Sequence, residues 1–152
     1  MCLAVVFAGP VLLAPRGALA GNADRAAVVE MVDAAVAAID RYGVPRAVRK
    51  TAPRTWYRSR SGLYIFVLGR DGTLLLHPDE GMEGRNVAAT LDAKGKPFIR
   101  DIIAETLAAP HEGAWTEYIW LDPRTGTSGT KHTYSRLAAG VVVAAGYISD
   151  HG

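Results

Sequence analysis

The segment "WTEYIWLDPRTGTSGTKHTY", residues 115–134, gathers aromatic and basic side chains around one turn-rich stretch. It contains Trp115, Trp120 and Lys131. An ammonium group that aromatic neighbours shield from water must find an anion, because an unpaired buried charge is very costly. That anion could be an internal acid or the carboxylate of a ligand. Alternatively, Lys131 could be an edge lysine that extends its charged end into water.

Other side chains could complete a pocket around this lysine. His77 precedes Pro78, which cannot continue a central sheet ladder, so we expect the histidine at a sheet rim. There it could donate to a carboxylate or simply bond a neighbouring loop. Strand alternation gives Tyr118 and Trp120 one face and Trp115 the other. Tyr118 would bring a hydroxyl to an apolar wall, and Trp115, after a turn, could fold over a pocket mouth. Core packing is the alternative for each aromatic residue, and Trp120 is assigned to it.

The sequence offers no support for catalysis. It lacks the GxSxG, HExxH, P-loop and GxGxxG patterns. Asp79, Glu80 and Glu83 lie near His77 and loosely resemble a metal site, but their spacing is not specific. We therefore predict a protein that is not an enzyme and that uses neither a metal nor a cofactor.

Length and composition indicate one folded domain. The chain has 152 residues, of which 49% are hydrophobic and 21% are charged. The formal net charge of +2 gives no reason to expect binding to nucleic acid. The basic stretch 44–60 could be an anion-binding patch, but no series of stacking aromatics accompanies it. We favour a solvated connection between a helix and a sheet.

The first twenty residues, "MCLAVVFAGPVLLAPRGALA", are typical of a secretory signal peptide. Their apolar part, residues 3–14, is much shorter than the ~20 residues that span a bilayer, which argues against the alternative of a membrane anchor. We expect cleavage before Gly21, a mature domain over residues 21–152 and a periplasmic or secreted location. Cleavage would remove Cys2, the only cysteine, and would leave no transmembrane span in the mature chain.

The remaining periodicity predicts an α+β fold. A helix is expected over residues 22–42, with Asn22 as its cap, and a second one over residues 96–109. "YIFVLG" and "TLLLHP" should form a hairpin around Asp71 and Gly72. Three more strands, at residues 114–121, 130–138 and 141–149, should form a meander. The order of helix, two strands, helix and three strands predicts a five-stranded antiparallel sheet.

These motifs, taken in order, resemble the single Cache family of extracytoplasmic ligand-sensing domains. The resemblance rests on "YIFVLGRDGTLLLHPDEGMEGRNVAATLDAKGKPFIRDII", "GAWTEYIWLDPRTG", "KHTY" and "GYI". It implies a PAS-like fold in which a long N-terminal helix packs behind the sheet and a pocket lies on the other face, below the connecting helix. Family members bind small molecules, often short carboxylates such as pyruvate, lactate, acetate or propionate. The pocket residues that the resemblance implies are Tyr64, His77, Trp115, Tyr118, Lys131 and Tyr134.

The resemblance implies a sensor-type protein that binds a small organic acid without transforming it, and that a protein partner or receptor could read. The alternative is an accessory subunit that binds another protein through its sheet or N-terminal helix, with the pocket vestigial or filled by side chains. A closed, apolar interior behind Lys131 would favour that alternative. An accessible cavity that ends at Lys131 and His77 would favour ligand binding.

Overall fold

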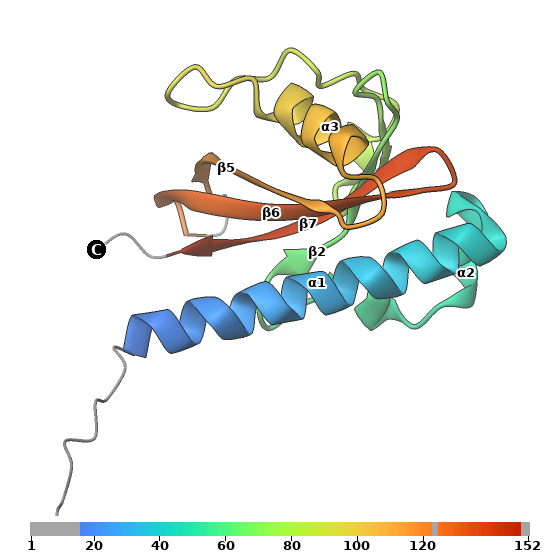
Figure 1. Cartoon of the computed structure of the whole chain (residues 1–152), viewed down its shortest axis with the longest axis horizontal. Coiled ribbons are helices and arrows are strands. Elements are labelled where there is room, and N and C mark those ends of the chain that lie inside the picture. Colours follow the sequence, from blue (N-terminus) through green and yellow to red (C-terminus); the bar gives the residue numbers. More distant parts are fainter. Residues whose placement is uncertain (1–15, 123–124, 150–152) are drawn as a thin grey trace, which may run out of the picture.

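The computed structural model describes residues 16–122 and 125–149, with side chains from Asp24 onward. Residues 1–15 of the predicted signal peptide lie outside this range. A five-stranded antiparallel sheet separates a long N-terminal helix on one face from a shorter helix on the other (Figure 1). The predicted α+β architecture with a five-stranded sheet is confirmed.

Helix α1 (Arg16–Tyr42) lies along one face of the sheet and ends at Gly43, whose φ is 71°. The predicted apolar stripe is buried against strands β6 and β7; it comprises Val28, Val32, Val36 and Ile39. The helical backbone begins six residues before Asn22, so Asn22 does not cap this helix. Polar contacts also fix the helix on the sheet, since Asp33 pairs with Arg136 over 2.7 Å.

The basic stretch after α1 has more structure than a solvated connection. It forms helix α2 (Val44–Lys50), the 3-10 helix η1 (Pro53–Thr55) and strand β1 (Tyr57–Arg58). Ala47 and Trp56 are buried and join the core under α1. Strand β2 (Leu63–Tyr64) pairs with β1 and leads the chain into the main sheet.

The main sheet has the strand order β4-β3-β7-β6-β5, and every neighbouring pair is antiparallel. The expected hairpin is present as β3 (Phe66–Leu68) and β4 (Leu74–Leu76). The expected meander is formed by β5 (Ala114–Leu121), β6 (Ser128–Ala138) and β7 (Val141–Ser149). Between the two strand groups, the chain forms the 3-10 helix η2 (Glu80–Met82), a loop and helix α3 (Phe98–Ala108).

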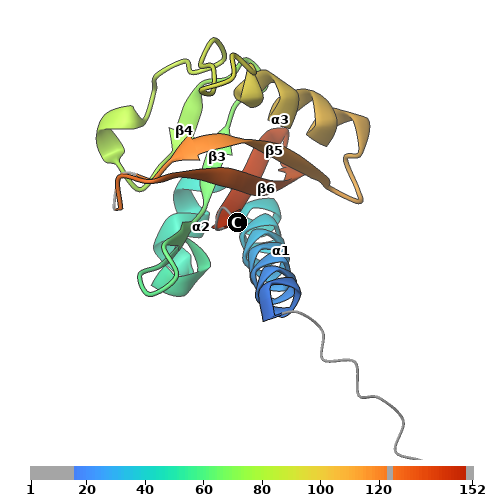
Figure 2. The same cartoon turned by 90° about the vertical axis from the view of Figure 1, so that its left-hand side faces the viewer.

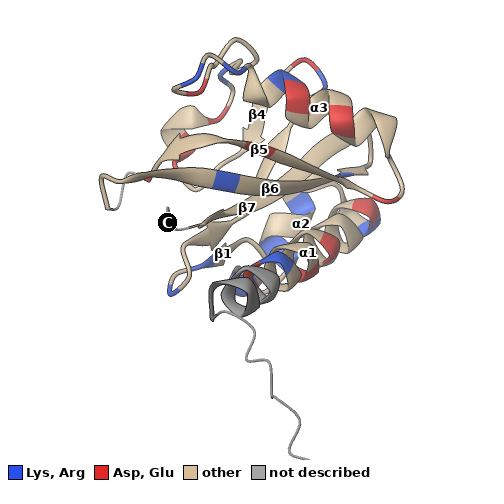
Figure 3. Ribbon diagram, turned by 60° about the vertical axis from the view of Figure 1, so that its left-hand side comes forward, with Lys and Arg blue, Asp and Glu red and all other residues tan. Residues whose placement is uncertain are grey.

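The two faces of the sheet have separate cores. Figure 2 shows α1 and α2 on one side of the sheet and α3 on the other. Along β6, Lys131, Thr133 and Ser135 point toward α3, because successive side chains of a strand alternate between the faces. Charged residues lie mainly on the helices and loops (Figure 3). A lysine on the α3 face of β6 is therefore an exception in this fold.

Candidate functional site

The α3 face of the sheet contains a cavity of about 100 Å³, called here the Lys131 cavity. This is several times the space that one water molecule needs. Most of its lining is apolar, and Lys131 is the only lysine or arginine among the lining residues. The lining residues come from the sheet, the loop after β4 and the start of α3: Tyr64, Phe66, Leu74, His77, Met82, Val87, Thr90, Phe98, Ile99, Tyr118, Trp120 and Lys131.

Lys131 is 4% exposed. Its Nζ donates to the Tyr64 hydroxyl over 3.0 Å and lies 4.8 Å from the ring centroids of both Tyr64 and Trp120. Burial disfavours the ammonium, but the nearby oxygens of Tyr118, Tyr64 and Asp122 outweigh it and raise the pKa of Lys131. Within the described residues, no carboxylate forms an ion pair with this lysine. The result is a buried cation whose direct contacts are aromatic rings and a neutral hydroxyl.

His77 approaches the same cavity from the end of β4. Its Nδ1 lies 3.1 Å from the Asp79 backbone nitrogen and 3.3 Å from the Asp79 carbonyl oxygen. The shorter contact, in which Nδ1 accepts the backbone N–H, favours a proton on Nε2. Its ring meets the edge of Tyr64 at a centroid distance of 5.5 Å. Burial lowers the pKa of His77, and the charge of Lys131 acts in the same direction, although Asp79 partly offsets both. His77 is thus arranged as a neutral hydrogen-bond donor.

Three aromatic rings form the wall next to the lysine. Phe98 stacks on Tyr118 with a centroid distance of 4.2 Å, and both rings meet Trp120 edge to face. Tyr118 is the direct cross-strand partner of Lys131, and its hydroxyl lies 3.1 Å from the Thr133 hydroxyl. These contacts leave each ring little freedom, so the wall beside Lys131 is preformed.

The loop that precedes α3 is attached to the edge of the sheet. The Asp92 carboxylate accepts from the backbone N–H groups of Ile119, Lys96 and Lys94 at distances of 2.8–2.9 Å. These bonds lower the pKa of Asp92, with the bond from Ile119 contributing most. The Lys96 ammonium adds a bond to the Glu117 carbonyl oxygen over 2.7 Å. Asp92 thereby fixes the segment that delivers Phe98 to the cavity wall.

The Asn86 side chain holds the other end of this loop. Its Nδ2 donates to the Asp71 carbonyl oxygen over 2.8 Å, and its Oδ1 accepts from the Ala88 backbone N–H over 3.1 Å. These bonds connect the turn of the β3–β4 hairpin to the segment that contains Val87. Asp71, Asn86 and Asp92 therefore support the cavity wall and do not themselves line the cavity.

Residues 25–150 match the family model described as Single Cache domain 2. The chain belongs to this family. Among curated proteins no relative matches the chain. Single Cache domains are sensor domains that bind small ligands, and several solved ones have the fold described above.

Three solved structures illustrate the similarity. A methyl-accepting chemotaxis protein from Vibrio parahaemolyticus is 20% identical and has a TM-score of 0.67, over 88% of this chain and 94% of its own. The periplasmic sensor domain of a chemotaxis protein is 19% identical with a TM-score of 0.62, over 93% and 100% of the two chains. A Cache chemosensory domain studied for carboxylic acid recognition is 17% identical with a TM-score of 0.64, over 90% and 100%. At these identities the comparison establishes the Cache fold.

The Cache fold brings four of the six predicted site residues together. Tyr64, His77, Tyr118 and Lys131 all line the Lys131 cavity. Whether they contact a ligand remains a prediction. Glu117 is not an internal acid for Lys131, because its side chain lies on the opposite face, where it bonds His132 over 2.8 Å.

The structure places Trp115 and Tyr134 elsewhere. Both pack under α1 on the other face of the sheet, with their ring centroids 5.2 Å apart. The Arg25 guanidinium covers the Trp115 ring at 4.0 Å from its centroid, and the Tyr134 hydroxyl donates to the Glu112 carbonyl oxygen. The expectation that Trp115 folds over the pocket mouth was therefore wrong. Strand alternation explains the result, because Trp115 is three residues from Tyr118 and Tyr134 is three residues from Lys131.

Trp120 is a cavity residue that the sequence reasoning assigned to the core. Strand alternation could have identified Trp120, because it lies two residues from Tyr118 and therefore on the same face of the sheet. In the part of the Cache domain that the structure describes, no cluster of three or more His, Cys, Asp or Glu side chains is arranged to hold a metal ion. No helix in the described ranges combines the length and the apolar character needed to cross a membrane.

Proposed function

We propose that this Cache domain is the ligand-binding part of a periplasmic or secreted sensor and that it binds a short monocarboxylate in the Lys131 cavity. The observation that carries the proposal is the position of the Lys131 ammonium. It is buried at a cavity wall, and its direct contacts are two rings and a hydroxyl. A carboxylate that entered the cavity would supply the anion that such a charge favours.

The size and polarity of the cavity favour a small acid with one charge. Only one lysine or arginine lines it, so a second carboxylate of the ligand would have no fixed cation to meet. A carboxylate oxygen could accept from Lys131, while the Nε2–H of His77 and the Tyr118 hydroxyl offer neutral donors. The methyl or ethyl group of the acid would pack against Phe66, Ile99 and other apolar lining residues.

The proposed role is binding without chemical change. The raised pKa of Lys131 keeps the side chain protonated at neutral pH, whereas covalent chemistry at a lysine requires the free amine. The pKa of His77 is lowered, and in the tautomer in which Nδ1 accepts the Asp79 backbone N–H, Nε2 carries a proton and serves as a donor.

The location of the protein is also part of the proposal. Residues 1–20 would act as a signal peptide, and cleavage before Gly21 would remove the first helical residues of α1. In the mature chain Asn22 would then lie near the new start of the helix, where an asparagine can cap it. A protein partner or receptor that senses the bound acid would complete the sensor.

An accessory subunit with a filled pocket is the second candidate. It would require side chains to occupy the space behind Lys131. The cavity that Lys131 and His77 line favours the ligand-binding proposal over this candidate.

A thermal-shift screen of two-carbon to four-carbon carboxylates tests the proposal. A ligand at about 100 times its dissociation constant adds ~2.7 kcal/mol to the free energy of unfolding, which corresponds to roughly 5 to 10 °C for a domain of this size. Amino acids and purines serve as controls for other ligand classes. We expect at least one short monocarboxylate to raise the melting temperature. A screen in which amino acids or purines raise the melting temperature, and no short monocarboxylate without an amino group does so, would contradict the proposal.

A further inference from the structure

Three polar side chains on the α1 face form a continuous hydrogen-bonded series. Glu117 Oε1 lies 2.8 Å from His132 Nδ1, and His132 Nε2 lies 3.0 Å from Ser149 Oγ. A hydroxyl, an imidazole within hydrogen-bond reach and an acid that orients the imidazole form the arrangement that activates a serine nucleophile. We propose that Ser149, His132 and Glu117 form a nucleophilic centre that accepts acyl groups from small esters.

The sheet register creates this series from three strands. Glu117 on β5 and His132 on β6 are direct cross-strand partners. Ser149 on β7 pairs with Thr130, which lies two residues before His132 and therefore on the same face. Because the three residues are far apart in the sequence, no local motif contains them. The chain can therefore lack the GxSxG and HExxH patterns and still contain a hydroxyl, an imidazole and an acid in a hydrogen-bonded series.

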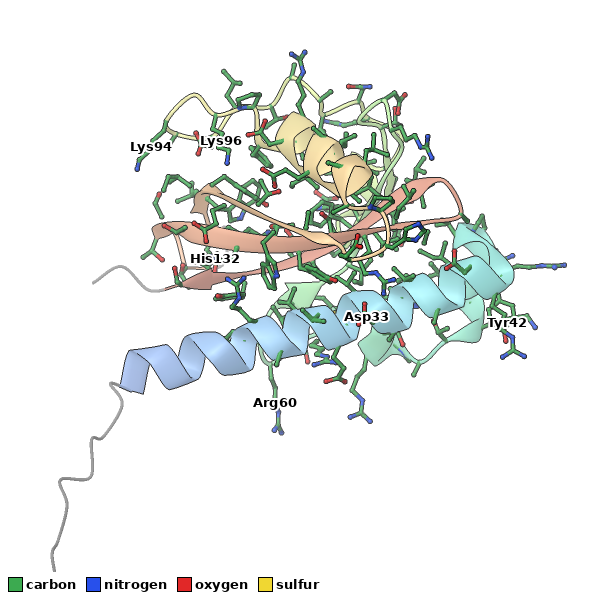
Figure 4. The ribbon with its side chains drawn as sticks, viewed as in Figure 1. Asp33, Tyr42, Arg60, Lys94, Lys96 and His132 are labelled. Carbon is green, nitrogen blue, oxygen red and sulfur yellow. The ribbon has the colours of Figure 1, made fainter. Side chains whose placement is uncertain are left out.

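Packing holds the imidazole in position. Tyr147 is directly opposite His132 across the strand pair, and the two rings stack with a centroid distance of 4.9 Å and an angle of 15°. The His132 side chain is 16% exposed, whereas that of Glu117 is 59% exposed. Figure 4 shows His132 on the side of β6 that faces α1. His132, the proposed general base, is thus largely shielded from water. Its Nδ1 contacts the acid that orients the ring, and its Nε2 faces Ser149.

The same face also carries a positive charge, two ring contacts away from Tyr147. Tyr147 meets the edge of Trp115 at a centroid distance of 6.4 Å, and the Arg25 guanidinium lies 4.0 Å from the Trp115 centroid. This charge makes the electrostatic potential of the face more favourable for the negative charge that develops on an ester carbonyl oxygen during attack. The centre lies on the opposite face of the sheet from Lys131, so it is independent of the proposed carboxylate site.

The proposed reaction balances without a cofactor. Ser149 Oγ attacks the carbonyl carbon of the ester while His132 Nε2 takes the hydroxyl proton. The bond to the alcohol oxygen breaks as His132 returns that proton to the leaving group, and acylated Ser149 remains. Water then attacks by the same proton relay and releases the acid and free Ser149. The Ser149 hydroxyl has one competing acceptor, the Thr130 carbonyl oxygen, at the longer distance of 3.3 Å.

Hydrolysis of p-nitrophenyl acetate by the full chain tests this centre. We expect Ser149→Ala and His132→Gln each to lower the protein-dependent rate at least about tenfold, because general-base catalysis contributes ~10²–10⁴-fold. We also expect mass spectrometry after brief exposure to the ester to find one acetyl group on Ser149. An unchanged rate in Ser149→Ala, or acetylation at other residues only, would overturn the proposal.

Two further variants distinguish a serine nucleophile from direct attack by an imidazole. An exposed imidazole can attack this ester by itself, and His111 is exposed, so His111→Gln is the matched control and should retain the rate. Glu117→Gln removes the orienting charge from a side chain that is mostly in solvent, so it should fold normally and still lose rate. Equal losses in His111→Gln and His132→Gln would indicate simple imidazole catalysis and would contradict a serine nucleophile.

Discussion

The Lys131 ammonium donates a hydrogen bond to the Tyr64 hydroxyl over 3.0 Å and thereby joins the long strand β6 to the short strand β2. Because the Tyr64 oxygen accepts this bond, its own proton remains available to another acceptor. A carboxylate that enters the cavity can therefore meet two donors, one charged and one neutral. The two residues differ in the strength of the bond that each can offer.

We predict that Tyr64→Phe weakens carboxylate binding about twofold to tenfold. The change removes one neutral hydrogen bond of ~0.5–1.5 kcal/mol and keeps the ring that covers Lys131. Titration calorimetry measures the effect. Tyr57→Phe is the matched control, because Tyr57 is the cross-strand partner of Tyr64 but is 45% exposed. A larger loss in Tyr57→Phe than in Tyr64→Phe would contradict the assigned role.

His77 should make carboxylate affinity nearly independent of pH from about pH 7 to about pH 8.5. Burial lowers its pKa from the ordinary value of 6.5, so the ring is already neutral in this range and binds as a donor. The lowered pKa also means that the folded state prefers the neutral ring. The contribution of His77 to the free energy of unfolding is therefore present above pH 6.5, and it is lost as the pH falls through the folded-state pKa.

Calorimetric titrations from about pH 5.5 to about pH 8.5, with wild type and His77→Gln, test the protonation state. Glutamine retains a neutral donor, so both proteins should show a flat profile above about pH 7. Affinity that falls steadily as the pH rises through the ordinary histidine range in wild type alone would mean that protonated His77 binds the ligand.

Trp120 and Trp115 form a matched pair for testing which face binds the ligand. We expect ligand-induced fluorescence changes to disappear in Trp120→Phe and to persist in Trp115→Phe, because only Trp120 lines the cavity. Affinity should fall about twofold to fivefold in Trp120→Phe, where the strongest cation–π partner of Lys131 is replaced by a weaker one. The reverse pattern in the two variants would place the ligand under α1.

Asp92 should stabilise the protein in a pH-dependent way. Its folded-state pKa is lowered by three backbone N–H donors, so its contribution is complete above the ordinary carboxyl value of 3.8 and is lost as the pH falls through the folded-state value. Asp92→Ala should lower the melting temperature at neutral pH, and the difference from wild type should narrow in acid. Asp24→Asn, at an exposed position on α1, should have no such effect. A difference in melting temperature between Asp92→Ala and wild type that stays constant down to acid pH would contradict a stabilising role for the Asp92 carboxylate charge.

The sequence predicts the strands of this domain well because their alternation and turn residues are local signals. Asp71 and Gly72 specify the turn of the β3–β4 hairpin, and the apolar runs on either side supply its strands. The start of α1 was not predicted, because the helix continues through Asn22 into a segment that the signal-peptide interpretation had separated from the domain.

Within the candidate site, the alternation of side chains along each strand was the sequence feature that best predicted which residues line the cavity. Tyr118, Trp120 and Lys131 share a face by alternation and cross-strand pairing, whereas motif resemblance alone also selected Trp115 and Tyr134. The contact between Lys131 and Tyr64 could not be deduced from local pattern. It joins residues 67 positions apart and depends on how β2 enters the sheet.

The Lys131→Met variant tests the central claim most directly. Methionine retains much of the side-chain volume and removes the charge, so the fold should persist while carboxylate affinity falls about tenfold to a hundredfold, the equivalent of a lost charge-assisted bond of ~1.5–3 kcal/mol. Lys94→Met is the matched control, because Lys94 is exposed on the loop before α3 (Figure 4). The measurement is calorimetric titration of both variants and wild type with the acid that most raises the melting temperature. We predict a selective loss in Lys131→Met, and an affinity equal to that of wild type in this variant would contradict the account.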